Sequence, residues 1–134
     1  AFIGDIDLTG FGPYYGDGTS SLADFRRTLR EVATLDARVW VTSHHRGVLT
    51  DRAQFLHHLA AFTARIDERG DKILGYLAEG PQTLAQLTAR RVMYPVGYEI
   101  AYADAAESNT IRQHLMELVE AGRVVREGDA YALA

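Results

Sequence analysis

The chain has 134 residues, 47% of them apolar, which suffices for the core of one average domain or two small ones and argues against disorder. The sequence contains no cysteine, so disulfides, cysteine zinc sites and a cysteine nucleophile are excluded, and any metal must use histidine and carboxylate ligands. The net charge of −4 argues against a general nucleic-acid-binding protein, and the absence of a bilayer-length apolar run or of a basic signal-peptide start leads us to expect a soluble cytoplasmic protein with no membrane partner.

The first strand pattern, Phe2–Ile3, is apolar and predicts a buried strand. Gly4 and Asp5 stand at its exit and lead into a glycine-rich loop, whose aromatic segment GPYYGDG suits a substrate entrance as well as it suits packing. A helix follows, because Ser21 begins a capping-box pattern and apolar residues then recur at helical spacing. The members of this apolar face are Leu22, Phe25, Leu29, Val32 and Leu35.

A second strand and a second helix complete the first half of the chain. The strand covers residues 39–41 and runs into the polar loop TSHHRG. Asp51, with Gln54 three positions later, can cap the next helix, whose apolar face begins at Phe55 and reaches Ile66. The order strand, helix, strand, helix predicts a layered α/β unit over residues 1–69.

The polar stretch IDERGDK, residues 66–72, marks the expected domain boundary. After it we expect a short helix around Ile73 that stops at Gly80, and then a helix capped by Thr83 and Gln86. Residues 93–102 follow as an irregular stretch. The last expected elements are a helix capped by Ser108 or Asn109 and a hairpin that turns at residues 127–129. Three short helices followed by a hairpin are the plan of a winged helix, which we assign to residues 70–134.

Asp5 and His44 stand at the exits of the two predicted strands. Strands of an α/β sheet place sites at their carboxyl ends, so these two side chains converge if the strands are close neighbours. Carboxylate oxygen and imidazole nitrogen suit zinc, iron or manganese, and a carboxylate can bridge two ions. On spacing alone, the alternative is an Asp that caps a turn and a solvated His.

The segment FIGDIDLTGFGPYYGDG, a helix and the segment VWVTSHHRGV together resemble the C-terminal half of metallo-β-lactamase-fold hydrolases. In that family a strand ends in Gly-Asp, whose Asp is a metal ligand, and a later strand ends in a small residue and a ligand His. The resemblance implies that Asp5 and His44 are these two ligands, with Ser43 as the small residue. The family more often has Gly-His-Gly at this point, so His45 stays an alternative to His44. Asp7 competes less well with Asp5, because only Asp5 directly follows the glycine.

The resemblance continues beyond the expected boundary, since some members of the superfamily carry a winged-helix tail similar to residues 73–134. The implied fold class is α+β: a partial α/β layer, the C-terminal half of an αββα sandwich, over residues 1–69, followed by a small winged helix. The implied function is metal-dependent hydrolysis of a small-molecule substrate. One or two ions, of zinc or else iron or manganese, would activate water to attack an ester, thioester, lactone, amide or phosphodiester. The residues that would bind the substrate are left unknown.

The family's first metal motif, His-x-His-x-Asp-His, is absent. The five histidines are His44, His45, His57, His58 and His114, and no two have a His-x-His spacing. We therefore expect the chain to be a fragment that is inactive alone and binds metal weakly, because a zinc site takes about four ligands. A missing half of the sandwich would expose apolar sheet surface, so we also expect self-association.

A winged-helix module that binds nucleic acid or a protein, on a non-catalytic scaffold, is the competing function. Asn109, Arg112 and Gln113 lie where a recognition helix would meet base edges. The segment from Asp71 to the end, however, holds six Lys or Arg against nine Asp or Glu, and phosphate contacts need local positive charge. We therefore favour the hydrolase and expect no nucleic-acid partner.

Overall fold

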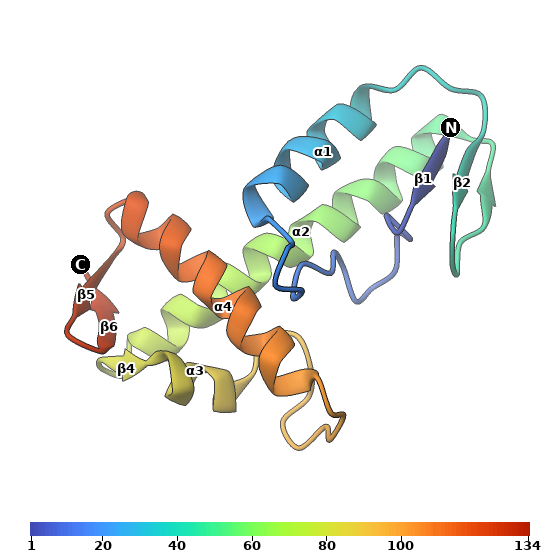
Figure 1. Ribbon diagram of the computed structural model, residues 1–134. Helices are drawn as coiled ribbons and strands as arrows, with labels where there is room; N and C mark the ends of the chain where they lie inside the picture. Colours follow the sequence, from blue (N-terminus) through green and yellow to red (C-terminus); the bar gives the residue numbers. More distant parts are fainter. The chain divides into compact units, whose positions relative to one another are not determined.

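The computed structural model describes residues 1–134, which divide into two compact units. Unit 1 comprises residues 1–13 and 23–67, and unit 2 comprises residues 14–22 and 68–134. The helix α2, Arg52–Leu77, contributes residues to both units and is drawn as one continuous ribbon in Figure 1. None of the helices has the length and apolar composition that a membrane crossing requires.

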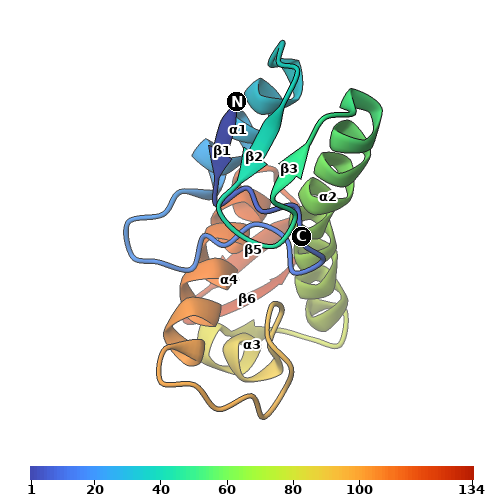
Figure 2. The ribbon, with the colours of Figure 1, turned by 90° about the vertical axis from the view of Figure 1, so that its right-hand side faces the viewer.

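Unit 1 contains a three-stranded sheet with the strand order β1-β2-β3, whose strands lie side by side in Figure 2. The strands are β1 (Phe2–Gly4), β2 (Trp40–Thr42) and β3 (Val48–Leu49). β1 and β2 are parallel, whereas β2 and β3 are antiparallel. The helix α1 (Leu22–Thr34) connects β1 to β2, as expected from the apolar spacing. The two-residue strand β3 was not predicted, because so short a strand leaves no periodicity in the sequence.

One face of this sheet forms the core of unit 1. Successive strand residues point to opposite faces, and Ile3, Trp40 and Leu49 are buried on the same side. The ring of Trp40 stacks on that of Phe55 in α2, with 4.6 Å between the centroids. The start of α2 is capped as predicted, since Oδ1 of Asp51 accepts a hydrogen bond from the Gln54 N–H at 2.8 Å.

The other face of the sheet is apolar and exposed. Phe2 pairs with Val41, and Val41 pairs with Val48, so these three side chains form one row across the strands. We call this row the open sheet face. Phe2 is 89% exposed and Val48 63% exposed. The prediction of a buried strand at Phe2–Ile3 is therefore wrong for Phe2 and correct for Ile3, which is 8% exposed.

The polar stretch 66–72 does not interrupt α2, so the separate short helix predicted around Ile73 is wrong. Ile66, Arg69, Ile73 and Leu77 are all buried, and they follow one another at intervals of three and four residues. The buried stripe therefore continues through the polar stretch by way of Arg69, whose guanidinium lies 5.3 Å from the ring centroid of Tyr15 in unit 2. The domain ranges 1–69 and 70–134 stay a prediction, because the compact units meet within this helix and residues 14–22 belong to the second unit.

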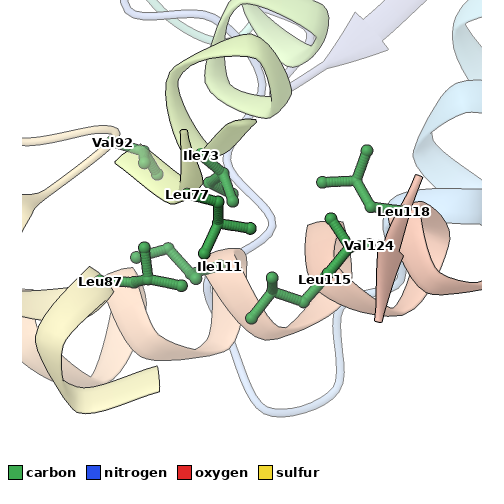
Figure 3. Close-up of a cluster of buried hydrophobic side chains, with 8 residues drawn as sticks. All are labelled: Ile73, Leu77, Leu87, Val92, Ile111, Leu115, Leu118 and Val124. Carbon is green, nitrogen blue, oxygen red and sulfur yellow. The ribbon is translucent and has the colours of Figure 1, made fainter. Parts of the chain in front are cut away.

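Unit 2 contains the end of α2, two further helices and an antiparallel sheet of strand order β4-β6-β5. These elements are β4 (Gln82–Thr83), α3 (Leu84–Arg90), α4 (Ala103–Glu120), β5 (Val124–Glu127) and β6 (Ala130–Leu133). The predicted hairpin and the capping box of Thr83 with Gln86 are both present. Figure 3 shows the core, to which α2, α3, α4, β5 and the turn after α3 contribute: Ile73, Leu77, Leu87, Val92, Ile111, Leu115, Leu118 and Val124.

Helix α4 begins five residues before Ser108 and six before Asn109, the two predicted caps. Its first residue is Ala103, and the preceding Tyr102 makes no capping hydrogen bond through its side chain. The start of the helix is instead held by a tertiary contact of the fully buried Glu107. The Glu107 carboxylate accepts hydrogen bonds from the backbone N–H groups of residues 92–94, at 2.6–2.9 Å. A carboxylate that binds a distant loop leaves no local capping signal.

Gly70→Ala tests the continuity of α2. We expect the variant to raise the free energy of unfolding by about 0.5–1 kcal/mol, because glycine inside a helix costs that much relative to alanine. A Cβ at residue 70 has room, since the nearest atom, Nδ1 of His114, lies 3.5 Å away. Gly80→Ala is the matched control and should destabilise, because Gly80 has a φ of +134°. Urea unfolding measures both variants, and a loss of stability in Gly70→Ala would contradict the continuous helix.

Candidate metal centre

Asp5 and His44 lie beside each other at one edge of the sheet in unit 1. β1 and β2 are parallel neighbours, so the chain leaves both strands at the same edge. The N–H of Ser43 donates to the carbonyl oxygen of Gly4 at 3.0 Å, which joins the two strand ends. Oδ1 of Asp5 is 3.7 Å from Nε2 of His44, and the two side chains are 86% and 67% exposed.

The separation of these two atoms fits two ligands of one metal ion. Two ligands at about 2.0–2.1 Å from a tetrahedral ion are about 3.4 Å apart, which is close to the observed 3.7 Å between Asp5 and His44. A hydrogen bond would need about 2.7–3.2 Å, and an ion pair this exposed adds little to stability. The same separation also suits an exposed ion pair, which would contribute little to stability.

Asp7, the weaker competitor of Asp5, is bound within its own loop. Its Oδ1 accepts hydrogen bonds from the backbone N–H of Thr9 at 3.1 Å and from the Thr9 hydroxyl at 2.9 Å. This short-range arrangement is the usual way in which an Asp side chain stabilises a turn. The capping role that spacing alone left open for Asp5 is thus performed by Asp7.

The backbone conformation of His45 directs its side chain away from that of His44. His45 has a φ of +59°, in the left-handed region that glycine adopts most easily. The two imidazole rings are 6.5 Å apart and inclined at 68°. The metallo-β-lactamase pattern has a glycine after its ligand His, and the conformation of His45 is one that favours glycine. The structure thus brings His44, and not His45, to Asp5.

Two further ionisable side chains near this loop are those of Arg46, within it, and His58, on α2. Nε of Arg46 donates to the carbonyl oxygen of Leu8 at 3.4 Å, so the side chain leans on the loop after β1. On α2, burial lowers the pKa of His58, and the positive charges of Arg46 and His57 lower it further. No group of three or more His, Asp or Glu side chains is arranged to hold a metal ion. Asp5 and His44 thus form a pair of side chains of metal-binding type, with no third such side chain arranged beside them.

Unit 2 uses the polar side chains of α4 to bind the segment 14–22. Nδ2 of Asn109 donates to the Gly16 carbonyl at 2.9 Å. The Gln113 side chain donates to the Tyr15 carbonyl at 2.9 Å and accepts from the Leu22 N–H at 2.6 Å. Two of the three side chains considered for reading bases are thus bound to backbone groups of this chain.

The contact between the segment 14–22 and α4 also includes two buried polar rings and a glycine whose backbone lies close to the helix. The hydroxyl of Tyr15 lies 2.7 Å from Nε2 of His114, and both side chains are buried. A Cβ at Gly16 would come within 2.9 Å of the Cβ of Ala106, so glycine is required there. No local pattern indicates these pairs, because they join residues more than 80 positions apart. Tyr15 and Gly16 of the GPYYGDG loop are therefore packing residues.

Tyr94 and Tyr98 belong to a group of tyrosines within unit 2. Their rings stack with 5.5 Å between the centroids. Burial raises the pKa of Tyr94 to about 12, and the neighbouring Tyr14 and Tyr102 contribute to the shift. Tyr14 of the GPYYGDG loop therefore lies close to this group.

Comparison with solved structures finds several similar chains, and two of them illustrate the likeness. One is a metallo-β-lactamase family protein from Thermus thermophilus, with 27% identity and a TM-score of 0.72 over 99% of this chain. The other is a β-lactamase domain protein from Burkholderia ambifaria, with 25% identity and a TM-score of 0.61 over 84% of this chain. The structural neighbours are metallo-β-lactamase family proteins. No protein-family model and no curated protein matches the sequence.

This chain covers only part of the matched structures. It spans 41% of the Thermus protein and 33% of the Burkholderia protein. The mixed α+β architecture agrees with a part of the metallo-β-lactamase fold, which confirms that much of the fold prediction.

Substitutions of His45 test the backbone conformation that sets His44 apart. We expect His45→Gly to be about as stable as the wild-type protein. Glycine removes the steric strain of a side chain in the left-handed region, which is about 1–2 kcal/mol, and this gain offsets an entropic cost of glycine of about 0.5–1 kcal/mol. His45→Val should be less stable than His45→Gly by at least about 1 kcal/mol, because a β-branched residue tolerates this region poorly. Urea unfolding at pH 7 measures the difference. Equal stabilities of the two variants would contradict the positive φ.

Proposed function

We propose that this chain is part of a metal-dependent hydrolase in which Asp5 and His44 are metal ligands. The observation that carries the proposal is the 3.7 Å approach of Asp5 Oδ1 to His44 Nε2 at adjacent ends of parallel strands. The likeness to metallo-β-lactamase family proteins over 99% and 84% of the chain supports it. Zinc, or else iron or manganese, fits a carboxylate and an imidazole.

Each of the two side chains has a defined part in this proposal. Asp5 presents Oδ1 toward His44 and would bind one ion or bridge two. His44 would bind through Nε2, the ring nitrogen that lies toward Asp5. One or two ions held by Asp5, His44 and further ligands would supply an activated water for attack on an ester, thioester, lactone, amide or phosphodiester. The small-molecule substrate is left open, because this fold serves many chemistries.

The whole protein must contribute further ligands and, we propose, a cover for the open sheet face. The chain spans less than half of each matched structure, and two ligands hold a zinc ion only weakly. Phe2 and Val48 of the open sheet face are mostly exposed, as is expected of surface that another part of the protein covers. The isolated chain is accordingly proposed to be inactive and to self-associate.

A winged-helix identity for residues 70–134 belongs to the same proposal. Its support is the succession of helices followed by the β5–β6 hairpin. A nucleic-acid role for this region has less support, because Asn109 and Gln113 are bound to backbone groups of residues 15, 16 and 22. The acidic balance after Asp71 also opposes phosphate binding.

Paramagnetic broadening by Mn²⁺ tests the ligand assignment on the chain itself. We expect the NMR signals of the Asp5 amide and the His44 ring to broaden first in a Mn²⁺ titration, and excess Zn²⁺ to restore them. Asp5→Asn and His44→Gln should each weaken the effect at least about tenfold, as the loss of a metal contact does. His57→Gln is the matched control, because His57 is also an exposed histidine of unit 1. Broadening centred on His45, or none at Asp5, would contradict the assignment.

Light scattering at increasing concentration tests the open sheet face. We expect the apparent mass of the isolated chain to rise above the 14.8 kDa of one copy. The double variant Phe2→Asp, Val48→Lys should stay at one copy, because charges replace the exposed apolar row. Met116→Lys on α4 is the control, since Met116 is 67% exposed but lies in unit 2. A wild-type mass of 14.8 kDa at every concentration would refute self-association.

A further inference from the structure

The loop that carries His44 is closed by a single side chain, that of Thr42. The Thr42 hydroxyl donates to the carbonyl oxygen of His44 at 2.6 Å and accepts from the N–H of Gly47 at 2.9 Å. The backbone N–H of Thr42 also donates to the Gly47 carbonyl at 2.9 Å. Thr42 is only 6% exposed. One buried hydroxyl thus connects the last residue of β2 to both the His44 backbone and the end of the loop.

These hydrogen bonds hold the loop in an unfavourable backbone conformation. His45 and Gly47 have φ values of +59° and +67°, and a non-glycine residue in this region is strained. Such strain persists only where the surrounding contacts determine the conformation. A hydroxyl has one proton and two acceptor positions, and Thr42 uses the proton and one acceptor within this loop.

The packing of unit 1 does not by itself require a hydroxyl at position 42. Thr42 points to the same side of β2 as Trp40, toward the apolar core, while Val41 belongs to the open sheet face. Valine has nearly the same shape as threonine and is at least as suited to a buried strand. The hydroxyl is therefore explained by the loop that it holds.

We propose that Thr42 is a positioning residue, which sets the place of the His44 ring relative to Asp5. The inference rests on the proposed function of these two residues as metal ligands. Without the hydroxyl, the His44 carbonyl and the Gly47 N–H turn to water, and the loop gains other conformations. The distance from His44 Nε2 to Asp5 Oδ1 then varies with the loop conformation. Metal binding becomes weaker, because part of its free energy is used to order the loop.

Thr42→Val and Thr42→Ser separate this role from a general effect on folding. We expect Thr42→Val to weaken the Mn²⁺-induced broadening at Asp5 and His44 at least about tenfold, as removal of a ligand's supporting contact does. Thr42→Ser keeps the hydroxyl and should restore binding to within about threefold of wild type, because the supporting contact is retained. Thr83→Val removes the N-cap of α3 in unit 2, and should lower stability while leaving the broadening unchanged.

A second readout uses no metal. Hydrogen exchange of the Gly47 amide should be at least about tenfold faster in Thr42→Val than in the wild-type protein or Thr42→Ser, because its acceptor is lost. Exchange in β2 at Val41 should change less, since its N–H is bound to the Ala1 carbonyl.

The outcomes distinguish this inference from the proposed function. Faster Gly47 exchange in Thr42→Val, together with weaker broadening that Thr42→Ser restores, supports the positioning role. Equal broadening in the wild-type protein and Thr42→Val would overturn the positioning role and leave the ligand assignment intact. Absence of broadening in the wild-type protein would overturn the ligand assignment, and the positioning role with it. Equal weakening in Thr42→Val and Thr83→Val would show a mere loss of stability, and would also overturn the positioning role.

Discussion

The parallel pairing of β1 with β2 is the constraint on which the candidate metal centre depends. Only a few hydrogen bonds make this pairing, among them those from the Val41 N–H to the Ala1 carbonyl and from the Ser43 N–H to the Gly4 carbonyl. A parallel pair requires a long connection, which α1 provides, and it sends both strand ends to one edge. Asp5 and His44 meet there because each is the first side chain beyond its strand that can bind a metal.

The same sheet has one covered face and one exposed apolar face. Its covered face is stabilised by Trp40 against Phe55, while its open face presents Phe2 and Val48 to solvent. Burial of apolar surface contributes roughly 25 cal/mol per Å², so an uncovered apolar row forgoes stabilisation that a partner surface would supply.

In unit 2, polar side chains hold irregular segments by their backbone groups. Glu107 accepts hydrogen bonds from three consecutive N–H groups, and Asn109 and Gln113 bind the segment that includes Tyr15. Backbone N–H and C=O groups that are removed from water destabilise the protein unless they have hydrogen-bond partners. These side chains supply the partners, and the fold therefore needs them. That requirement accounts for polar residues on α4 that, from their position in a third helix, suggested contacts with bases.

The sequence by itself determined the features whose causes lie within a few residues: the cap at Asp51, the capping box at Thr83, and the hairpin that turns at residues 127–129. It also indicated Asp5 and His44 as strand-end residues. Only the tertiary structure decided that α2 continues through Arg69, that α4 begins at Ala103, and that His44 rather than His45 lies beside Asp5. The physical reason is the distance along the chain between the interacting groups. Caps and turns are hydrogen bonds between residues that are close in sequence, whereas the burial of Arg69 and Glu107 depends on partners farther away in the chain. The left-handed backbone of His45 depends on the closure of a whole loop.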